Sequence, residues 1–332
     1  MTQRIGIIGA GIMGADHART VHRFVSGATV ELLADLDADR VTAAADAVGA
    51  RATVDPLAVI ADPAVDAVLI ASHDSTHAAL VRACLDAGKP VLCEKPLAPT
   101  LGECLDVVAA EKAVVGDGPG LVTLGFMRRF DPGYVQMRRD IVDGAIGRPL
   151  IVHSVGRGVT SGPGADDELL ITGSAVHDFD IVPWLLGSPV VEVSWHAPAP
   201  SSLAGFQDPQ MMLLRTQDGA LSTVENFLNA RYGYDIRCEV VGETGSLTLA
   251  EPARVVRDRE LSHGIGYARD WRPRFADAYR LELQAWVDGL DTGTPTTLAT
   301  AADGLQASAV ATAVITSMRE GGRTVRVTTD VR

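Results

Sequence analysis

The first 127 residues alternate short apolar runs with longer runs in which apolar residues recur at helical spacing. The apolar runs predict strands at residues 4–9, 30–35, 51–53, 67–71, 90–93 and 121–126. The runs between them predict helices at residues 12–25, 39–48, 76–87 and 101–115, and a short helix that Pro56 opens. Strands that alternate with helices form a parallel sheet covered on both faces, so the pattern predicts a doubly wound α/β domain over residues 1–127.

Beyond residue 148 the pattern changes, because predicted strands follow one another through turns. Strands are predicted at residues 149–155, 190–197, 211–216, 220–228, 236–241 and 246–249, and helices at residues 168–186, 274–289 and 300–318. Asp218-Gly219 is a typical hairpin turn between two of these strands. Strands joined by turns favour a mostly antiparallel sheet, so we expect residues 128–332 to form an α+β domain.

Length and charge limit the classes of function. The 332 residues suit two domains, and a formal net charge of −13 repels nucleic acid phosphates. The most apolar helical run, residues 304–318, is short, and the N-terminus lacks the basic and apolar regions of a signal peptide. None of the four cysteines forms a Cys-x-x-Cys pair. We therefore expect a cytoplasmic protein with reduced thiols that binds neither nucleic acid nor membranes.

A glycine-rich turn follows the first predicted strand. Gly9, Gly11 and Gly14 have the spacing Gly-x-Gly-x-x-Gly, and a helix is predicted to begin inside this run. In that context the first glycine permits a tight turn, the second lets the backbone approach a pyrophosphate, and the third lets the helix pack against the strand. The helix N-terminus, at Ile12 and Met13, adds a favourable potential for an anion. The turn predicts a dinucleotide site rather than an incidental glycine-rich loop.

An acidic residue, Asp35, ends the second predicted strand. A carboxylate at this point can accept hydrogen bonds from the ribose hydroxyls of the adenosine, and it would repel a 2′-phosphate. Leu36 and Asp37 follow it, rather than an arginine. The position therefore predicts NAD rather than NADP as the cofactor. The alternative, that Asp35 only caps the helix beginning near Asp39, stays open.

The run Glu94-Lys95-Pro96 comes directly after the predicted strand at residues 90–93. Ligands of open α/β sheets bind at the carboxyl ends of the strands, so Lys95 is expected near the reactive end of the cofactor. Only three of the 29 basic residues are lysines, and lysine, unlike arginine, can lose its proton. The run therefore predicts a catalytic lysine. The alternative is a surface salt bridge between Glu94 and a neighbour.

Three segments of the chain, taken in order, resemble a known family. Residues 9–14, Glu94-Lys95-Pro96 and Val176-His177-Asp178-Phe179-Asp180 occur in the order found in the glucose–fructose oxidoreductase, inositol dehydrogenase and MocA-like (Gfo/Idh/MocA) family. Residues 125–134, 232–239 and 274–279 are similar to inositol 2-dehydrogenases, and the likeness extends over nearly the whole chain. The resemblance implies a Rossmann domain followed by an open-faced sheet, a sequential NAD mechanism, and a homo-oligomer, either a tetramer or a dimer.

The resemblance also implies roles for individual residues. Lys95 would hydrogen-bond the reacting hydroxyl and stabilise its alkoxide-like charge. His177 would act as the general base, a task that suits the ordinary histidine pKa of about 6.5. Further cofactor contacts are implied at Ser72, His77 and Glu94, and further substrate contacts at Arg128, Arg157, Gly173, Tyr234 and Tyr279. A lone histidine on a helix and an aromatic residue in a strand can also be structural, and that reading stays open for His177 and Tyr234.

The chain departs from the family pattern at three glycines. Inositol dehydrogenases resembling this chain have an aspartate one helical turn before the histidine, where Gly173 stands here. They also tend to have a histidine and an asparagine in the strand that begins the second domain, where the matching stretch of this chain, residues 155–158, has Gly156 and Gly158 instead. Three polar side chains are therefore replaced by hydrogen. We expect an altered pocket that takes a polyol, a cyclitol, a sugar or a larger glycoside in place of myo-inositol.

Two functions are consistent with these residues. The first is an NAD-dependent dehydrogenase that oxidises a secondary alcohol, as Lys95 and His177 indicate. The second is a non-catalytic sensor that binds a dinucleotide and a sugar, which the three glycines would allow. The spacing of His73 and His77 is possible for a metal, but no third ligand is evident, so we expect none. The site residues, rather than the fold, favour the enzyme.

Overall fold

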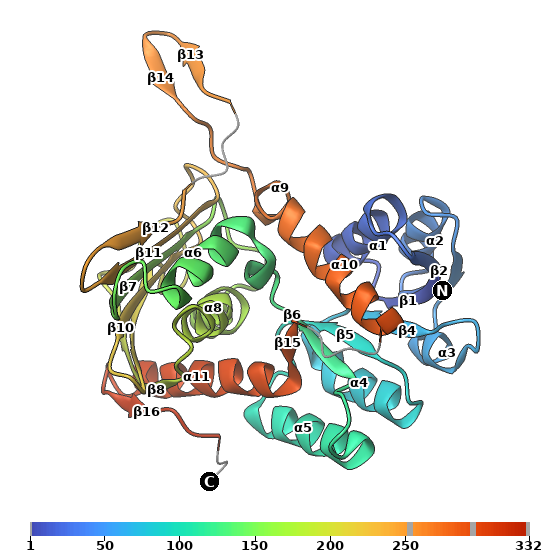
Figure 1. Ribbon diagram of the computed structural model, residues 1–332. Helices are drawn as coiled ribbons and strands as arrows, with labels where there is room; N and C mark the ends of the chain where they lie inside the picture. Colours follow the sequence, from blue (N-terminus) through green and yellow to red (C-terminus); the bar gives the residue numbers. More distant parts are fainter. Residues whose placement is uncertain (1, 251–254, 293–296, 330–332) are drawn as a thin grey trace. The chain divides into compact units, whose positions relative to one another are not determined.

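The computed structural model describes residues 2–250, 255–292 and 297–329, which form two compact units (Figure 1). One unit contains the chain up to Met127 together with Asp277–Ser308, and the other contains Arg128–Ala276 together with residues from Ala309 onward. The division after Met127 coincides with the predicted domain boundary. The segment Asp277–Ser308 does not follow the prediction, because it packs with the first unit instead of the second.

The first unit is built on a seven-stranded sheet in the order β15-β6-β5-β4-β1-β2-β3. Its strands are β1 (Gln3–Ile8), β2 (Ala28–Ala34), β3 (Arg51–Thr53), β4 (Ala67–Ile70), β5 (Val91–Glu94), β6 (Val122–Gly125) and β15 (Ala299–Thr300). The first six pair in parallel, and every residue of β4, β5 and β6 is buried. The strand order reverses between β1 and β4, so the predicted doubly wound fold is confirmed.

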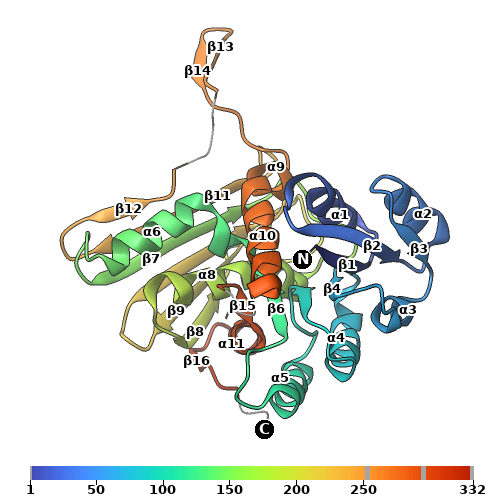
Figure 2. The ribbon, with the colours of Figure 1, turned by 45° about the vertical axis from the view of Figure 1, so that its right-hand side comes forward.

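Helices cover both faces of this sheet. They are α1 (Ile12–Phe24), α2 (Ala38–Asp46), α3 (Pro56–Ala61), α4 (His77–Asp86), α5 (Leu101–Val115) and α10 (Ala276–Thr292), with a 3₁₀ turn at Asp74–Thr76. Figures 1 and 2 show α1 and α2 on one side of the sheet and α3, α4 and α5 on the other. Their ends follow local capping rules, as in the reciprocal pair of Thr100 and Glu103 that begins α5.

Specific contacts hold the segment Asp277–Ser308 against the first unit. β15 pairs antiparallel with the edge strand β6. The Gln284 side chain accepts a hydrogen bond from the backbone of Ser26 at 2.8 Å, and the thiol of Cys104 lies 3.4 Å from the Ser308 hydroxyl. These partners are far apart in sequence. The local hydrophobic pattern therefore gave no signal that this segment returns to the first sheet.

The second unit contains another seven-stranded sheet, in the order β12-β11-β7-β10-β9-β8-β16. Its strands are β7 (Pro149–Arg157), β8 (Val190–His196), β9 (Gln210–Thr216), β10 (Leu221–Phe227), β11 (Asp235–Gly242), β12 (Ser246–Thr248) and β16 (Val325–Arg326). All neighbours pair antiparallel except β7 and β10. Buried and accessible positions alternate along β9 and β10, as expected for a sheet with one covered face. The predicted α+β architecture is confirmed.

Helices of the second unit gather on one face of this sheet. They are α6 (Pro132–Val142), α7 (Asp167–Leu169), a π-helical turn (Leu170–Ala175), α8 (Val176–Leu186) and α9 (Trp271–Arg274), after a 3₁₀ turn at Met127–Phe130. The C-terminal part of α11 (Ala301–Arg319) also belongs here. In both ribbon views α6 and α8 lie on the same side of the sheet, and no described helix of this unit covers the other side. The sheet is therefore open-faced.

The elements of the second unit that were absent from the sequence prediction include helix α6 and a small hairpin. Helix α6 begins with Asp131 as its cap and Pro132 in its first turn, which is a local start signal. A small hairpin, β13 (Arg257–Arg259) with β14 (Ser262–Gly264), stands apart from the seven-stranded sheet in Figure 1. All six of its strand residues are exposed, so it has no apolar face that a hydrophobic pattern could reveal.

One helical run, Asp167–Leu186, is long and apolar enough to cross a membrane by length and composition. The sequence had indicated residues 304–318 as the most apolar helical run, but among the described residues that run does not meet this criterion. More than half of its most apolar window is buried inside the protein. It also carries Asp178 and Asp180, which are ion-paired with Arg128 and Arg129. We therefore describe it as the core helix of the second unit.

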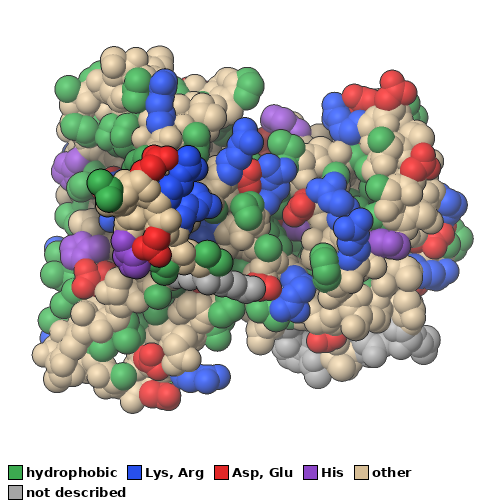
Figure 3. All heavy atoms as spheres, turned by 90° about the horizontal axis from the view of Figure 1, so that it is seen from above, with side chains coloured by type: hydrophobic (Ala, Val, Ile, Leu, Met, Phe, Trp, Pro, Cys, Tyr) green, Lys and Arg blue, Asp and Glu red, His purple; other side chains and the backbone are tan. Residues whose placement is uncertain are grey.

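Charged side chains of the second unit are mostly paired. Ion pairs join Arg148 to Glu243, Arg157 to Glu225, Arg237 to Asp235 and Arg272 to Asp270. Figure 3 shows basic and acidic side chains lying next to one another over the face that it presents. On this face the basic side chains are interspersed with acidic ones rather than forming a uniformly basic tract.

Candidate functional site

In the glycine turn of the first unit, two of the three glycines cannot be replaced by a residue with a side chain without a clash. Gly9 has a φ of +98°, and a Cβ there would lie 2.5 Å from the carbonyl oxygen of Ala71. A Cβ on Gly14 would lie 1.8 Å from the carbonyl oxygen of Gly9. A Cβ on Gly11 would meet nothing within 4 Å, and no side chain caps the N-terminus of α1. The turn therefore combines close packing with open space at a helix N-terminus, which fits a dinucleotide pyrophosphate.

Asp35 is fixed beside this turn. Its carboxylate accepts hydrogen bonds from the backbone N–H groups of Ala10 at 2.7 Å and Asp37 at 3.0 Å, and Arg40 approaches to 3.2 Å. Burial alone would raise the pKa of Asp35, but these donors and Arg40 bring it below its ordinary value. The group is therefore held as an anion beside the glycine turn. Asp37 caps α2 instead, so the capping role considered for Asp35 belongs to its neighbour.

His77 links two loops at the carboxyl edge of the sheet. Its Nδ1 lies 2.7 Å from the Pro96 carbonyl oxygen, and its Nε2 lies 3.2 Å from the Ser72 carbonyl oxygen. The Ser72 hydroxyl in turn lies 2.7 Å from that of Thr76. The imidazole is buried and joins the turn after β4 to the turn that contains Lys95. His77 therefore has a clear positioning role within the predicted cofactor site.

Glu94 is the buried last residue of β5, and its carboxylate binds the backbone of Lys95. Its Oε1 accepts a hydrogen bond from Nε2 of the buried His17 at 2.8 Å, and its Oε2 accepts one from the Lys95 backbone at 3.2 Å. Burial would raise the pKa of Glu94, but His17, Lys95 and His77 bring it below its ordinary value. Gly125, opposite Glu94 on β6, leaves room for this carboxylate. The alternative of a surface salt bridge at Glu94 is wrong.

Two other aromatic side chains of the first unit, those of Tyr279 and His73, lie in different surroundings. The Tyr279 ring lies edge-to-face with His17 at 5.6 Å, so it supports the pair of His17 and Glu94. His73 is exposed and contacts Ser75, whereas His77 is buried, so the two histidines do not share a site. Within residues 2–250, 255–292 and 297–329, no group of three or more histidine, cysteine or acidic residues could hold a metal ion.

In the second unit, His177 lies in the first turn of α8, directly after the π-helical turn. Its side chain is half-buried, whereas Asp178 and Asp180 beside it are buried. Arg128 donates to Asp178 at 2.8 Å, and the guanidinium of Arg129 binds Asp180 through three hydrogen bonds. These two buried ion pairs anchor the helix turn that carries His177. Arg128 therefore has a clear positioning role behind the histidine.

The structure separates two further predicted substrate residues. Tyr234 packs edge-to-face against Phe275 at 6.3 Å, and Phe275 lies beneath the Arg128 guanidinium. Arg157 alternates with Gly156 along β7, so it lies on the uncovered face of the sheet, opposite to α8. There it binds Glu225 at 2.6 Å and the hydroxyl of Tyr232 at 3.1 Å. Tyr234 thus stays near the His177 region of this unit, whereas Arg157 does not.

The three glycines that depart from the family pattern are not equivalent. A Cβ on Gly158 would lie 2.8 Å from the carbonyl oxygen of Leu228, so the backbone closes this position. A Cβ on Gly156 would lie 3.1 Å from Oδ1 of Asn226, a side-chain atom. A Cβ on Gly173 would make only ordinary contact, 3.4 Å from a Leu169 methyl group. The expectation that all three glycines open room for a ligand is therefore wrong, and Gly173 alone leaves space.

Several residues that shape these regions were missed from the sequence. Arg40 and His17 lie in helices and become significant only through Asp35 and Glu94. Asn226 is buried on β10 directly beside Gly156, and the Ser174 hydroxyl donates to its Oδ1 at 2.7 Å. Asn226 lies at a position of β10 where the alternation of buried and accessible residues places the side chain inside. A polar residue at such a position is the local signal that could have identified it.

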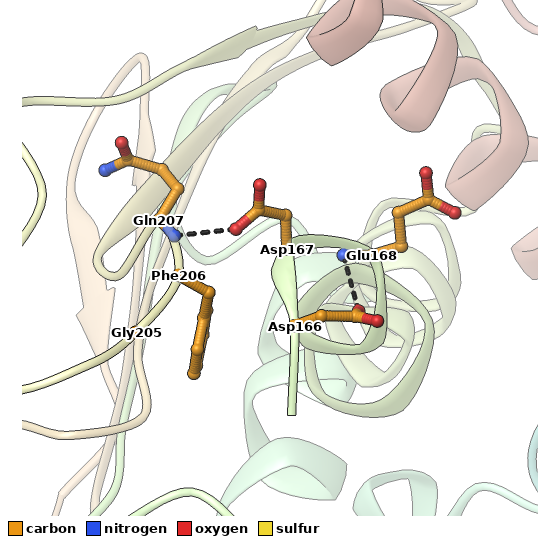
Figure 4. A pocket seen from close by; sticks show the side chains of 6 residues that line it. All are labelled: Asp166, Asp167, Glu168, Gly205, Phe206 and Gln207. Atoms are coloured by element: carbon orange, nitrogen blue, oxygen red, sulfur yellow. Dashed lines mark hydrogen bonds between the residues drawn. The ribbon is translucent and has the colours of Figure 1, made fainter. Parts of the chain in front are cut away.

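A separate pocket of about 410 Å³ lies at the start of the helix that leads to His177 (Figure 4). It is lined by Asp166, Asp167, Glu168, Gly205, Phe206 and Gln207. The Asp167 carboxylate accepts the backbone N–H of Gln207 at 2.6 Å, and Asp166 accepts that of Glu168 at 3.0 Å. Glu168 is paired with Arg319. Because each carboxylate holds a loop or a helix end, we assign this pocket a structural role.

Known families match both parts of the chain. The profile of an oxidoreductase family described as having an NAD-binding Rossmann fold matches residues 3–114. The profile of the same family's C-terminal alpha/beta domain matches residues 139–327.

Individual relatives and solved structures agree with these matches. Inositol 2-dehydrogenase 2 of Paenarthrobacter aurescens is 54% identical over 98% of this chain and 99% of its own length. A protein of the same name from Saccharopolyspora erythraea is 51% identical over 97% of this chain and 94% of its own. The crystal structure of myo-inositol dehydrogenase from Lactobacillus casei, in complex with NAD(H) and myo-inositol, superposes with a TM-score of 0.93 at 29% identity, over 100% of this chain and 98% of that one.

Proposed function

The chain belongs to the Gfo/Idh/MocA family and is an NAD-dependent oxidoreductase acting on CH–OH groups, and on this basis we propose that its substrate is a cyclitol. The reaction moves hydride between a secondary alcohol of the substrate and NAD. The observation that carries the proposal is the similarity, at 54% and 51% identity over nearly the whole chain, to two inositol 2-dehydrogenases. Sugars and glycosides form the wider class of candidate substrates, because no side chain occupies position 173 in the turn before His177.

In the proposed mechanism the reacting groups are Lys95 and His177. The glycine turn and Asp35 would hold NAD, which would supply the hydride acceptor for the alcohol carbon. Lys95 donates a hydrogen bond to the alcohol oxygen and stabilises its developing negative charge. His177 takes the hydroxyl proton, so the alcohol loses one hydride and one proton and becomes a ketone. Buried groups hold both residues: Glu94 and His77 for the lysine, and Asp178 for the histidine turn.

A non-catalytic sensor is not favoured. The most similar relatives that we compared are named as dehydrogenases, and Lys95 and His177 are both present. The glycines at 156 and 158 do not open the pocket, which removes two of the three observations that had suggested a sensor.

The experiment is a panel of inositol isomers, sugars and glycosides incubated with NAD, with NADH absorbance as the readout. Turnover of a cyclitol supports the proposal.

Lys95→Met and His177→Gln should each lower kcat by at least about 100-fold, the usual size of a general acid–base contribution. Lys112→Met is the matched control, because this exposed lysine hydrogen-bonds Gly116 and Asp117 at the end of α5. Turnover that survives both active-site changes would overturn the assigned roles.

We propose further that the chain forms a homo-oligomer, a tetramer or a dimer, through the uncovered face of the second sheet. Val241, Ile151 and Leu221 lie side by side in register on that face, and Ile151 is 39% exposed. A second copy would bury this aliphatic row. Ile151→Glu should lower the mass measured by light scattering, whereas Val142→Glu, at an exposed end of α6, should not. A monomeric wild type would contradict the proposal.

We propose the cytoplasm as the location. All four cysteines are buried free thiols, and burial raises the pKa of Cys84 and Cys238 to about 12, so they stay protonated. Such thiols suit a reducing compartment. Recovery of the activity in the membrane or secreted fraction of cells would contradict this assignment.

A further inference from the structure

A buried polar group fills the place that Gly156 leaves on the covered face of the second sheet. Asn226 is 1% exposed and lies next to Gly156 in the parallel pair of β7 and β10. Neighbouring residues of paired strands point to the same face, so the amide of Asn226 occupies the space over the glycine. A Cβ at position 156 would lie 3.1 Å from Asn226 Oδ1, so the amide would have to shift by a few tenths of an ångström to admit a side chain there.

The buried amide of Asn226 orients the accessible hydroxyl of Ser174 through a hydrogen bond. Ser174 Oγ donates to Asn226 Oδ1 at 2.7 Å, and Ser174 is half-exposed, three residues before His177. Ser174 belongs to the π-helical turn, in which Gly173 carries no side chain. The same amide lies beside Asp178, where burial raises the pKa of the carboxyl group although the neighbouring Arg128 and Asn226 lower it. Asn226 is thus part of the group that holds the His177 turn.

The direction of this hydrogen bond has a chemical consequence. The single proton of the Ser174 hydroxyl is used for Asn226, so the lone pairs of Ser174 Oγ remain for an outside group. The site therefore offers an acceptor and no donor at this point. A substrate hydroxyl can satisfy it, whereas a methyl ether or a deoxy position cannot.

On the basis of the proposed function, we propose that Ser174 is a specificity-determining residue that accepts a hydrogen bond from a non-reacting hydroxyl of the cyclitol. Asn226 is the positioning residue that orients it. In this chain the pair takes over hydroxyl recognition that polar side chains at 156 and 173 would otherwise supply. A hydroxyl next to the reacting carbon is the expected partner, because Ser174 and His177 lie within one turn of the same helix.

The first test is Ser174→Ala, with myo-inositol and its mono-deoxy and mono-O-methyl derivatives as probes. The KM for the hydroxylated probe that wild type prefers should rise about tenfold, with a smaller change in kcat and an unchanged KM for NAD. The derivative that lacks the recognised hydroxyl should be insensitive to the substitution. Ser174→Thr, which keeps the hydroxyl, should restore most of the affinity.

A matched control separates this role from loss of helix stability. Thr172→Ala removes a hydroxyl from the same π-helical turn, where it donates only to the Glu168 carbonyl oxygen. This change should leave the KM for every probe unaltered. An equal loss in Thr172→Ala and Ser174→Ala, or an equal loss for all probes, would overturn the proposal.

The second test is the coupling between Asn226 and Ser174. Asn226→Ala should raise the same KM. The KM of the double variant should not exceed the higher KM of the two single variants, because both changes remove the same interaction. Additive losses would overturn the positioning role. Should Asn226→Ala fold poorly, the Ser174 series alone decides. Absence of turnover by wild type on any cyclitol would contradict the proposed function, whereas turnover with an unchanged Ser174→Ala would contradict this inference alone.

Discussion

Two groups of glycines shape the molecule in different ways. In the first unit, Gly9 and Gly14 are required by the backbone itself, because any Cβ would meet a carbonyl oxygen. In the second unit, Gly158 has the same kind of constraint, but a Cβ on Gly156 would approach the Asn226 side chain closely, and a Cβ on Gly173 would make only ordinary contact with Leu169. The cofactor turn is therefore fixed by its own chain, whereas the region around His177 depends on which side chains fill it.

This difference indicates where the protein can change without losing its fold. A backbone clash can be relieved only by moving a strand or a helix, whereas a side-chain clash can be relieved by a second substitution. Cofactor binding should therefore tolerate few replacements. Substrate recognition should tolerate many, provided that neighbours such as Gly156 and Asn226 change together.

The largest effect is expected from Gly14→Ala. Its Cβ would lie 1.8 Å from the Gly9 carbonyl oxygen, so α1 must move away from β1. We expect a loss of about 3 kcal/mol in the free energy of unfolding and a loss of at least about tenfold in NAD affinity. Urea unfolding and isothermal titration with NAD measure the two quantities. Gly102→Ala, at an open position of α5, is the control, and similar behaviour of the two variants would remove the distinction between the glycines.

The second effect concerns the choice of cofactor. Asp35→Ser removes the carboxylate expected to bind ribose hydroxyls, and it releases Arg40, which lies 3.2 Å from it. Loss of charge-assisted hydrogen bonds should lower the preference for NAD over NADP by about 10- to 100-fold. The ratio of kcat/KM values for the two cofactors is the measurement. Arg40→Ala in the Asp35→Ser background should abolish any gain with NADP, and an unchanged ratio in Asp35→Ser would show that Asp35 does not select the cofactor.

Local rules predicted the cofactor unit closely. Strand β3, helix α5 and the glycine turn lie where the sequence placed them, because short-range periodicity, caps and turns determine them. The return of Asp277–Ser308 to the first sheet could not be predicted, because it depends on long-range contacts such as that between Ser26 and Gln284.

The region around His177 was predictable only in part. The sequence identified the helix, the histidine and the missing aspartate at position 173. It could not show that Asn226 covers Gly156, or that Arg157 points to the opposite face, because both depend on the register of paired strands. A one-residue change in register would exchange the two faces, and the hydrophobic pattern of β7 does not extend clearly to its end.

A third prediction concerns position 173, where a side chain can be added without a clash. Gly173→Asp can be accommodated, because the nearest atom to a Cβ is a Leu169 methyl group at 3.4 Å. The new carboxylate lies one turn before His177, and a hydrogen bond to a substrate hydroxyl should raise kcat/KM for myo-inositol about tenfold. Gly158→Ala should instead destabilise the protein, because the Leu228 carbonyl oxygen is 2.8 Å away. No gain in Gly173→Asp would mean that the region has been reshaped beyond this position.

The smallest effect is expected in the acid range, at the buried pair behind Lys95. The pKa of Glu94 lies below its ordinary value of 4.5, since His17, Lys95 and His77 outweigh the effect of burial. A carboxyl group with a lowered folded-state pKa stabilises the protein above its unfolded pKa, and this contribution is lost as pH falls through the folded value. As the pH falls below the ordinary glutamate value of 4.5, wild type should therefore lose stability more steeply than Glu94→Gln, by about 1 kcal/mol, the net value of one hydrogen bond. Urea midpoints at each pH measure the difference. Parallel curves for the two proteins would show that Glu94 is not held as an anion, and that the support of Lys95 rests on packing alone.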